Sequence, residues 1–298
     1  MDFVLTLLTV PNRGSLDDRR VGAVRAALRD LGAETEAPNW LSPNLACDIL
    51  FSNLSPDQAE AAAARTLEGE AVDFAAQALP GRRKKLLVAD MDGTVVAGET
   101  LDELADFAGL KDKIAAITAR AMNGEIDFNE SLRERIALLK GLREDCLKRT
   151  CERLELAPGA RELVRVMRRD GAYTALVSGG FTFFTKKIAE RLRFHHQSGN
   201  TLDIERGVLT GKVVDPIVNR DGKLNTLIHL AAKKQIAMAD ILAVGDGAND
   251  LPMILAAGLG VAYRAKPVVA AKARFRLNHA DLRGPLYLQG YTDAQIDH

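Results

Sequence analysis

Short apolar runs alternate with stretches of helical periodicity along the whole chain, and the order of these patterns divides it into two units. In residues 1 to about 80, β-rich runs at 3–10 and 46–51 flank a helix pattern, and Ser55 followed by Pro56 predicts the start of a second helix. The apolar positions of the first helix pattern are Val21, Val24, Leu28 and Leu31. Strand, helix, strand and helix in so short a segment predict a small α+β module of ferredoxin-like type.

From about residue 85 onward, strand patterns alternate with helix patterns, which predicts a parallel, doubly wound α/β sheet. The predicted strands are 86–89, 173–177, 241–244 and 260–262, with a hairpin at 201–214. Residues 97–157 break the alternation, because they carry only amphipathic helix patterns. We expect this stretch to form a helical cap, inserted after the first strand, that could cover a site as a lid.

These patterns predict an N-terminal domain at 1–80 and an α/β core at 85–298, with the cap at 97–157. The N-terminal segment has no cluster of catalytic residue types, so we interpret it as a packing or dimerisation module, with a ligand sensor as the alternative. Residues 81–85 read as a linker. Removal of residues 1–80 is therefore expected to leave a soluble, active core.

The composition is that of an ordinary globular protein, with 298 residues of which 47% are hydrophobic. Its 40 basic and 40 acidic side chains give no net charge, so neither nucleic acid nor an anionic membrane is an expected partner. We see neither an apolar run of membrane-spanning length nor a signal sequence. Three scattered cysteines fit a reducing compartment, and we expect a cytoplasmic protein.

Candidate chemistry begins at Asp90-Met91-Asp92-Gly93-Thr94, directly after the apolar run 86–89. A buried parallel strand delivers such acids to its carboxyl end, where open α/β sheets bind ligands. Two carboxylates so close repel each other unless a cation, a shared proton or solvent relieves them, and Mg²⁺ suits such oxygen ligands. A calcium loop of the EF-hand type is excluded, because its sixth and twelfth positions would be Val95 and Leu101.

Two further predicted strands also end in polar residues suited to phosphate chemistry. One ends at Ser178-Gly179-Gly180, where we expect a hydroxyl beside exposed backbone amides at a helix start. The other ends at Gly245-Asp246-Gly247, followed by Asn249 and Asp250. Between them Lys223 is expected to open a helix as a fixed counter-charge. His195 and His196 have no metal-ligand partners at suitable spacing, and we assign them no role.

Taken in order, these motifs resemble the haloacid dehalogenase-like phosphatase superfamily and, within it, the phosphoserine phosphatase family. The superfamily resemblance rests on Asp90 to Thr94, Ser178, Lys223 and Gly245 to Asp250. The phosphoserine phosphatase resemblance adds Glu99, Met122-Asn123-Gly124, the run from Phe128 to Arg135, and Ser178 to Phe181. Both cover residues 85 to about 290. Many relatives carry an ACT-type regulatory domain, to which the first 80 residues are loosely similar.

The resemblance implies a Mg²⁺-dependent hydrolysis of O-phosphoserine, the last step of serine biosynthesis, through an aspartyl-phosphate. Asp90 would be the nucleophile and Asp92 the general acid and base. The metal would be held by Asp90, the Asp92 carbonyl and Asp246, with support from Asp250. Phosphate would be bound by Ser178, Gly179, Lys223 and Asn249. On the amino-acid side, Glu99 would face the ammonium, Arg135 the carboxylate, and Met122 and Phe128 would form an apolar wall.

Three alternatives remain open at the level of sequence. A phosphotransferase would keep the fold and change the acceptor. A dehalogenase has no need for the second acid, Asp92, and is disfavoured. A phospho-accepting receiver domain would share acids, hydroxyl and lysine, but it needs no cap and would be much shorter. The alternative for Glu99 and Arg135 is that they are ordinary surface charges on cap helices with no role in binding.

Overall fold

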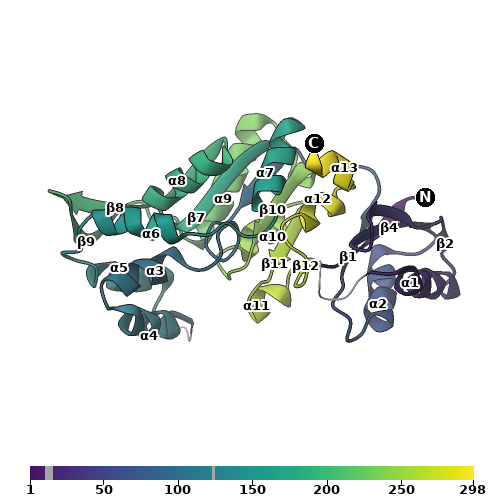
Figure 1. Ribbon diagram of the computed structural model, residues 1–298, viewed down its shortest axis with the longest axis horizontal. Coiled ribbons are helices and arrows are strands. Elements are labelled where there is room, and N and C mark those ends of the chain that lie inside the picture. Colours follow the sequence, from purple (N-terminus) through teal and green to yellow (C-terminus); the bar gives the residue numbers. More distant parts are fainter. Residues whose placement is uncertain (11–15, 123–124) are drawn as a thin grey trace.

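The computed structural model describes residues 1–10, 16–122 and 125–298, and for Met122 the backbone alone. Figure 1 shows a small N-terminal unit and a helical cap at opposite ends of the molecule, with an α/β core between them. Within the described residues, no helix is both long enough and apolar enough to cross a membrane.

The N-terminal unit is an antiparallel sheet with two helices on one face. Strands run in the order β2-β4-β1-β5, and β3 pairs with β4. Their bounds are β1 (Phe3–Leu8), β2 (Glu34–Thr35), β3 (Asn39–Ser42), β4 (Ala46–Ser52) and β5 (Asp73–Ala78). The helices are α1 (Asp18–Asp30) and α2 (Pro56–Thr66). As predicted, Ser55 caps α2, with Pro56 in its first turn. The ferredoxin-like prediction is confirmed, with three strands that the sequence patterns did not indicate.

Both faces of this small sheet are buried. Leu5 and Leu7 of β1 pack in the apolar cluster formed with α1 and α2. Leu8 points to the other face and joins the apolar cluster of the α/β core. Side chains alternate between faces along a strand, so an ordinary half-exposed strand would show polar residues at every second position. Here the second face is covered by the core, which explains why β1 carries so little polar alternation.

A buried polar network holds the second face to the core. Arg82 donates to the Asp48 carboxylate at 2.7 and 3.1 Å, to the Thr6 hydroxyl at 3.1 Å and to the Leu288 carbonyl at 3.1 Å. The Arg82 and Asp48 side chains are only 10% and 3% exposed. Residues 81–85 are therefore more than a solvated linker, because Arg82 fastens the two units together.

The core sheet has seven strands in the order β12-β11-β10-β6-β7-β8-β9. They are β6 (Leu86–Ala89), β7 (Tyr173–Phe181), β8 (His196–Glu205), β9 (Val208–Val214), β10 (Ile241–Gly245), β11 (Leu259–Tyr263) and β12 (Phe275–Leu277). All neighbours are parallel except β8 and β9, which form the predicted hairpin. The doubly wound α/β prediction is confirmed, with one antiparallel edge strand.

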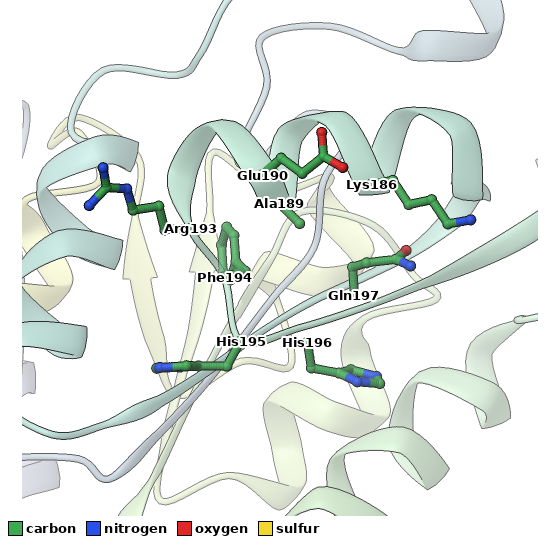
Figure 2. Close-up of a pocket in the computed structure, with 8 residues that line it drawn as sticks. All are labelled: Lys186, Ala189, Glu190, Arg193, Phe194, His195, His196 and Gln197. Carbon is green, nitrogen blue, oxygen red and sulfur yellow. The ribbon is translucent and has the colours of Figure 1, made fainter.

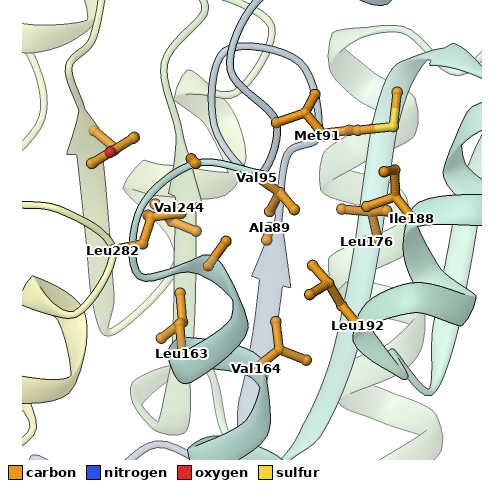
Figure 3. Close-up of a cluster of buried hydrophobic side chains, with 14 of the residues drawn as sticks. Ala89, Met91, Val95, Leu163, Val164, Leu176, Ile188, Leu192, Val244 and Leu282 are labelled. Carbon is orange, nitrogen blue, oxygen red and sulfur yellow. The ribbon is translucent and has the colours of Figure 1, made fainter. Parts of the chain in front are cut away.

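Helices cover both faces of the core sheet. On one face Ala89, Leu176 and Val244 pack against α7 (Ala160–Arg169) and α8 (Thr182–Leu192) (Figure 3). On the other, Val88 and Ala243 pack against α9 (Arg220–Lys234) and α10 (Leu251–Ala256). Short elements complete the chain, namely η1 (Met238–Asp240), α11 (Pro267–Ala270), α12 (Gly284–Leu288) and α13 (Asp293–Asp297).

The cap consists of α3 (Thr100–Phe107), α4 (Lys111–Met122), α5 (Phe128–Ala137) and α6 (Asp145–Arg153). Its two connections to the core run antiparallel, because Ala97 donates to Glu155 and Ala157 donates to Val95, both at 2.9 Å. The turn between α5 and α6 also bonds to the β8–β9 hairpin through backbone groups. Gly141 donates to Leu209 at 2.9 Å, and Leu209 donates to Leu142 at 2.9 Å. The hairpin thus carries one side of the cap.

Candidate active site

Three neighbouring strands bring the candidate residues together. In the core sheet β6 lies between β10 and β7, and all three are parallel. Their carboxyl ends meet at one edge of the sheet, and ligand sites typically lie at this edge in such sheets. Asp90 follows β6, Asp246 follows β10, and Ser178 lies near the end of β7.

At the centre of this edge three carboxylates lie close together, and one ammonium pairs with two of them. Oxygens of Asp90, Asp246 and Asp250 lie within 4.8 Å of one another. The Lys223 Nζ is 2.7 Å from Asp90 Oδ1 and 2.6 Å from Asp250 Oδ1. Asp250 Oδ2 also accepts the backbone N–H groups of Asp246 and Gly247, at 3.2 and 2.9 Å. Asp250 is therefore fixed on both oxygens, whereas Asp90 and Asp246 have capacity for a further positive group.

The electrostatics of this cluster fit a divalent cation. Burial and the neighbouring Asp250 raise the pKa of Asp90 well above its usual value, although Lys223 opposes the shift. The same two causes raise the pKa of Asp246 to about 6. One lysine cannot balance three acids, and carboxylate oxygens at this spacing are the ligands that divalent cations prefer. The described residues thus provide a site for such an ion.

The second acid of the motif, Asp92, is oriented by bonds to both of its oxygens. Its Oδ1 accepts the Thr100 N–H at 2.7 Å, and its Oδ2 accepts the Ser178 hydroxyl at 3.1 Å. Burial raises the pKa of Asp92, while these hydrogen bonds lower it. A carboxyl group with a raised pKa, held beside a nucleophile candidate, is suited to proton transfer.

Two glycines allow the loops to approach this closely. Gly93 has φ +68°, and a Cβ there would lie 2.8 Å from Asp246 Oδ2. A Cβ at Gly180 would lie 2.7 Å from Asp92 Oδ2. Any larger residue at these positions would displace a carboxylate of the site.

The cap reaches the site through α5. A Cβ built on Gly179 would lie 3.3 Å from the Phe128 Cζ and 3.5 Å from the Asn249 amide nitrogen, so all three residues meet. Arg135 lies about two turns further along the same face of α5. It is half-buried, and its Nε donates to the Ser131 carbonyl at 3.1 Å. The Met122 side chain and the following Asn123 and Gly124 lie outside the described residues.

Glu99 precedes α3 and makes no capping bond to it. Desolvation by the surrounding protein atoms and the charge of Asp92 raise the pKa of Glu99 to about 7, although part of the residue is exposed to solvent. The negative charges of Glu99 and Asp102 act on Arg135, whose pKa is lowered by burial. Glu99 and Arg135 therefore belong to the same electrostatic environment, on the cap side of the acidic cluster.

Two predictions about local structure were wrong. Ser178 does not begin a helix, because β7 continues to Phe181 and α8 starts at Thr182. Lys223 does not open α9 either, since Asn219 caps that helix and α9 starts at Arg220. The Lys223 side chain lies inside the protein, where it is 0% exposed.

Two residues of the site were given no role from the sequence. The buried Thr94 donates its hydroxyl to Asp246 Oδ1 at 3.2 Å, and its place in the first motif was the only signal. Lys266 donates its backbone N–H to the Asp246 carbonyl at 3.0 Å, and its charge lowers the pKa of both Glu99 and Asp246. As an exposed lysine before a proline, Lys266 had no distinguishing pattern.

The paired histidines lie elsewhere. They line a pocket of about 250 Å³ between α8 and the start of β8, and their side chains point to opposite sides (Figure 2). The Nδ1 atom of His195 accepts the Thr174 N–H at 3.1 Å, and the imidazole ring stacks on the Tyr173 ring. These contacts indicate that His195 contributes to packing.

Known proteins are similar to this chain over most of its length. The family described as haloacid dehalogenase-like hydrolase matches residues 87–255. A phosphoserine phosphatase of Streptomyces coelicolor is 40% identical over 99% of this chain and 73% of its own length. A phosphoserine phosphatase of Mycobacterium tuberculosis is 44% identical over 76% of this chain, but only 56% of that protein is covered. A crystal structure of a haloacid dehalogenase family hydrolase from Salmonella enterica superposes with a TM-score of 0.84, 32% identity and coverage of 96% and 98% of the two chains.

Proposed function

Since this chain belongs to the haloacid dehalogenase-like hydrolases, and within them to the phosphoserine phosphatase family, we propose that it hydrolyses O-phosphoserine to serine and phosphate. The observation that carries the proposal is that Glu99, directly before α3, and Arg135, in α5, both belong to the cap, which reaches the site through Phe128. The cluster suits a phosphate ester, and the cap pair suits the carboxylate and ammonium of an amino acid. We assign the reaction to the last step of serine biosynthesis.

Asp90 would be the nucleophile. Its Oδ1 accepts the Met91 N–H at 2.7 Å and contacts Lys223, so the attack falls to Oδ2. A bond forms between Oδ2 and phosphorus while the bond from phosphorus to the serine oxygen breaks, and Asp92 gives its proton to that oxygen. Asp92 then takes a proton from water, which attacks phosphorus and releases phosphate from Asp90. The bonds from Thr100 and Ser178 hold Asp92 in place for both proton transfers.

The carboxylates of Asp90 and Asp246 and the backbone carbonyl of Asp92 would hold Mg²⁺, with Asp250 supporting the site. The bound ion would supply positive charge against the phosphoryl oxygens. The chain itself would supply further donors to those oxygens from Ser178, Gly179, Lys223 and Asn249. Met122 and Phe128 would exclude water when the cap is closed.

For the division of the chain into domains, we propose an N-terminal domain at 1–80 and an α/β core at 85–298, with the cap at 97–157.

A small-molecule substrate fits this site, since the candidate residues converge on one buried edge between core and cap.

A steady-state screen tests the function. The purified chain is offered O-phosphoserine, other phosphorylated metabolites and an aryl phosphate, each with and without Mg²⁺, and released phosphate is measured. We expect a preference for O-phosphoserine that depends on Mg²⁺. A preference for esters without an amino-acid group would refute the proposed substrate. Phosphoryl transfer to an added alcohol in place of phosphate release would favour a phosphotransferase instead.

A further inference from the structure

Asn200 lies where the pairing of β7 with β8 is interrupted. Val177 pairs with Ser198, but the next pair is Phe181 with Asn200. Residues 178–180 therefore lie opposite the single residue Gly199, which makes β7 bulge at the active site. A bulge removes ladder bonds and redirects side chains, so its backbone groups need other partners.

The Asn200 side chain supplies those partners. It is completely buried, and its Nδ2 donates to the Gly179 carbonyl at 2.7 Å and to the Val218 carbonyl at 3.3 Å. Its Oδ1 accepts the Val218 N–H at 2.7 Å. Both amide hydrogens and the oxygen are thus used. One side chain connects the bulge of β7 to the segment that leads into α9, the helix of Lys223.

From Asn200 a continuous path leads to the general acid candidate. In a planar trans peptide the C=O and the following N–H point in opposite directions. Asn200 holds the Gly179 carbonyl, so the Gly180 N–H points away from it, toward the Ser178 Oγ at 2.8 Å. The Ser178 hydroxyl in turn donates to Asp92 Oδ2 at 3.1 Å. The peptide's orientation therefore determines where the Ser178 hydroxyl and the Asp92 carboxyl lie.

We propose that Asn200 is a positioning residue for phosphoryl transfer, which acts through the Gly179–Gly180 peptide on Ser178 and Asp92. This inference rests on the proposed phosphatase chemistry but not on the identity of the alcohol. A buried strand residue would then determine where the Ser178 hydroxyl and the Asp92 carboxyl lie.

A double-mutant cycle tests this role. Asn200→Ala, Ser178→Ala and the double variant are assayed with O-phosphoserine and with an aryl phosphate, and Tm is measured for each. We expect Asn200→Ala to lower kcat about ten- to hundredfold with little change in KM, because catalytic groups are misplaced. In the Ser178→Ala background the same change should lower kcat less than about twofold, because the path is already cut. Additive effects, or wild-type kcat in the single variant, would overturn the proposal.

Two further variants keep the test decisive. Asn200→Asp keeps an acceptor for Val218 but loses the donor to Gly179, and it replaces Asn200→Ala in the cycle if the latter does not fold. Thr201→Ala, at the exposed neighbouring position, should leave kcat unchanged. If the wild type hydrolyses only the aryl phosphate, the proposed substrate fails, while the cycle still measures the role of Asn200 on that ester.

Discussion

The Lys223 ammonium lies 2.6 Å from the Asp250 carboxylate, and both side chains are 0% exposed. The same ammonium contacts Asp90, so it pairs with two of the three acids in this buried cluster. We expect Lys223→Met to lower the free energy of unfolding by about 3–5 kcal/mol in metal-free buffer, because it leaves buried carboxylates without their partner. Urea unfolding with and without Mg²⁺ measures the loss and how much of it the cation restores.

Lys85 offers a matched control for that substitution. It pairs with Asp240 at 2.7 Å, but its side chain is 68% exposed. Lys85→Met should therefore cost less than about 1 kcal/mol. Equal losses for the two variants would show that burial of the Lys223 pair has no energetic consequence.

Asp90→Asn should abolish turnover by several orders of magnitude, because an amide cannot attack phosphorus. The variant should nevertheless fold, since it removes one of several mutually repelling carboxylates. The measurement is kcat together with Tm in metal-free buffer. Asp92→Asn provides the comparison: attack by Asp90 survives there, so intact mass after mixing with substrate should reveal a phosphorylated protein. Near-normal turnover in Asp90→Asn would remove Asp90 from the role of nucleophile.

Arg135→Ala should separate substrate recognition from phosphatase chemistry. A guanidinium on the cap would bind the serine carboxylate, so we expect kcat/KM for O-phosphoserine to fall. The loss of transition-state stabilisation should be about 2–4 kcal/mol. An aryl phosphate without a carboxylate should lose much less. Arg133 on the same helix is the control, because it forms an exposed ion pair with Asp215. Parallel losses on both substrates would mean that Arg135 supports the fold or the phosphate.

The pKa of Glu99 predicts a pH dependence for KM. It lies above the ordinary value of 4.5, at about 7, so Glu99 takes up a proton as pH falls through that range. The neutral form would no longer attract the substrate ammonium. Relative to the KM for an aryl phosphate, the KM for O-phosphoserine should rise up to about tenfold per pH unit below this pKa. Glu99→Gln should raise KM at pH 8 and abolish the slope, and an unchanged slope would contradict the assignment.

Removal of residues 1–80 should leave the candidate site intact but destabilise the protein. The deletion uncovers core residues that now pack against Leu8 and Ala46, and it removes Asp48, the partner of Arg82. We expect lower Tm and lower solubility with kcat largely retained in the folded fraction. Arg82→Met in the full chain should reproduce about 3 kcal/mol of the destabilisation. A truncated protein as stable as the full chain would show that the interface contributes little.

The acidic cluster could be predicted because parallel strands deliver their ends to one edge. The motifs after β6 and β10 needed no knowledge of distant contacts beyond that rule. The burial of Lys223 could not be predicted in the same way. It depends on ion pairs with Asp90 and Asp250, which lie far from Lys223 in the sequence. The start of α9 was also missed, because a single polar residue before a helix pattern does not fix where the helix begins.

Two further features depend on tertiary contacts and could not be predicted from the sequence: the second buried face of β1 and the bulge of β7. Thr6 in β1 is buried and accepts a hydrogen bond from Arg82. The sequence around Thr6 does not indicate that this second face of the N-terminal sheet is covered. The Ser178-Gly179-Gly180 run predicts the start of a helix, whereas Asn200, next to the predicted hairpin, holds it within the sheet. A signal did exist there, since asparagine is depleted in strands, and a buried one implies a specific set of bonds.

The covering of both sheet faces in the N-terminal unit restricts how two copies of the chain can associate through it. The α1 and α2 helices occupy one face and the α/β core the other, while β5 lies beside the core through Asp73, which accepts the Asn278 and His279 N–H groups at 2.9 Å. A dimer formed through this unit would therefore use the outer surfaces of α1 and α2 or the edge of the sheet at β2. Dimerisation by stacking open sheets would first require the unit to detach from its own core.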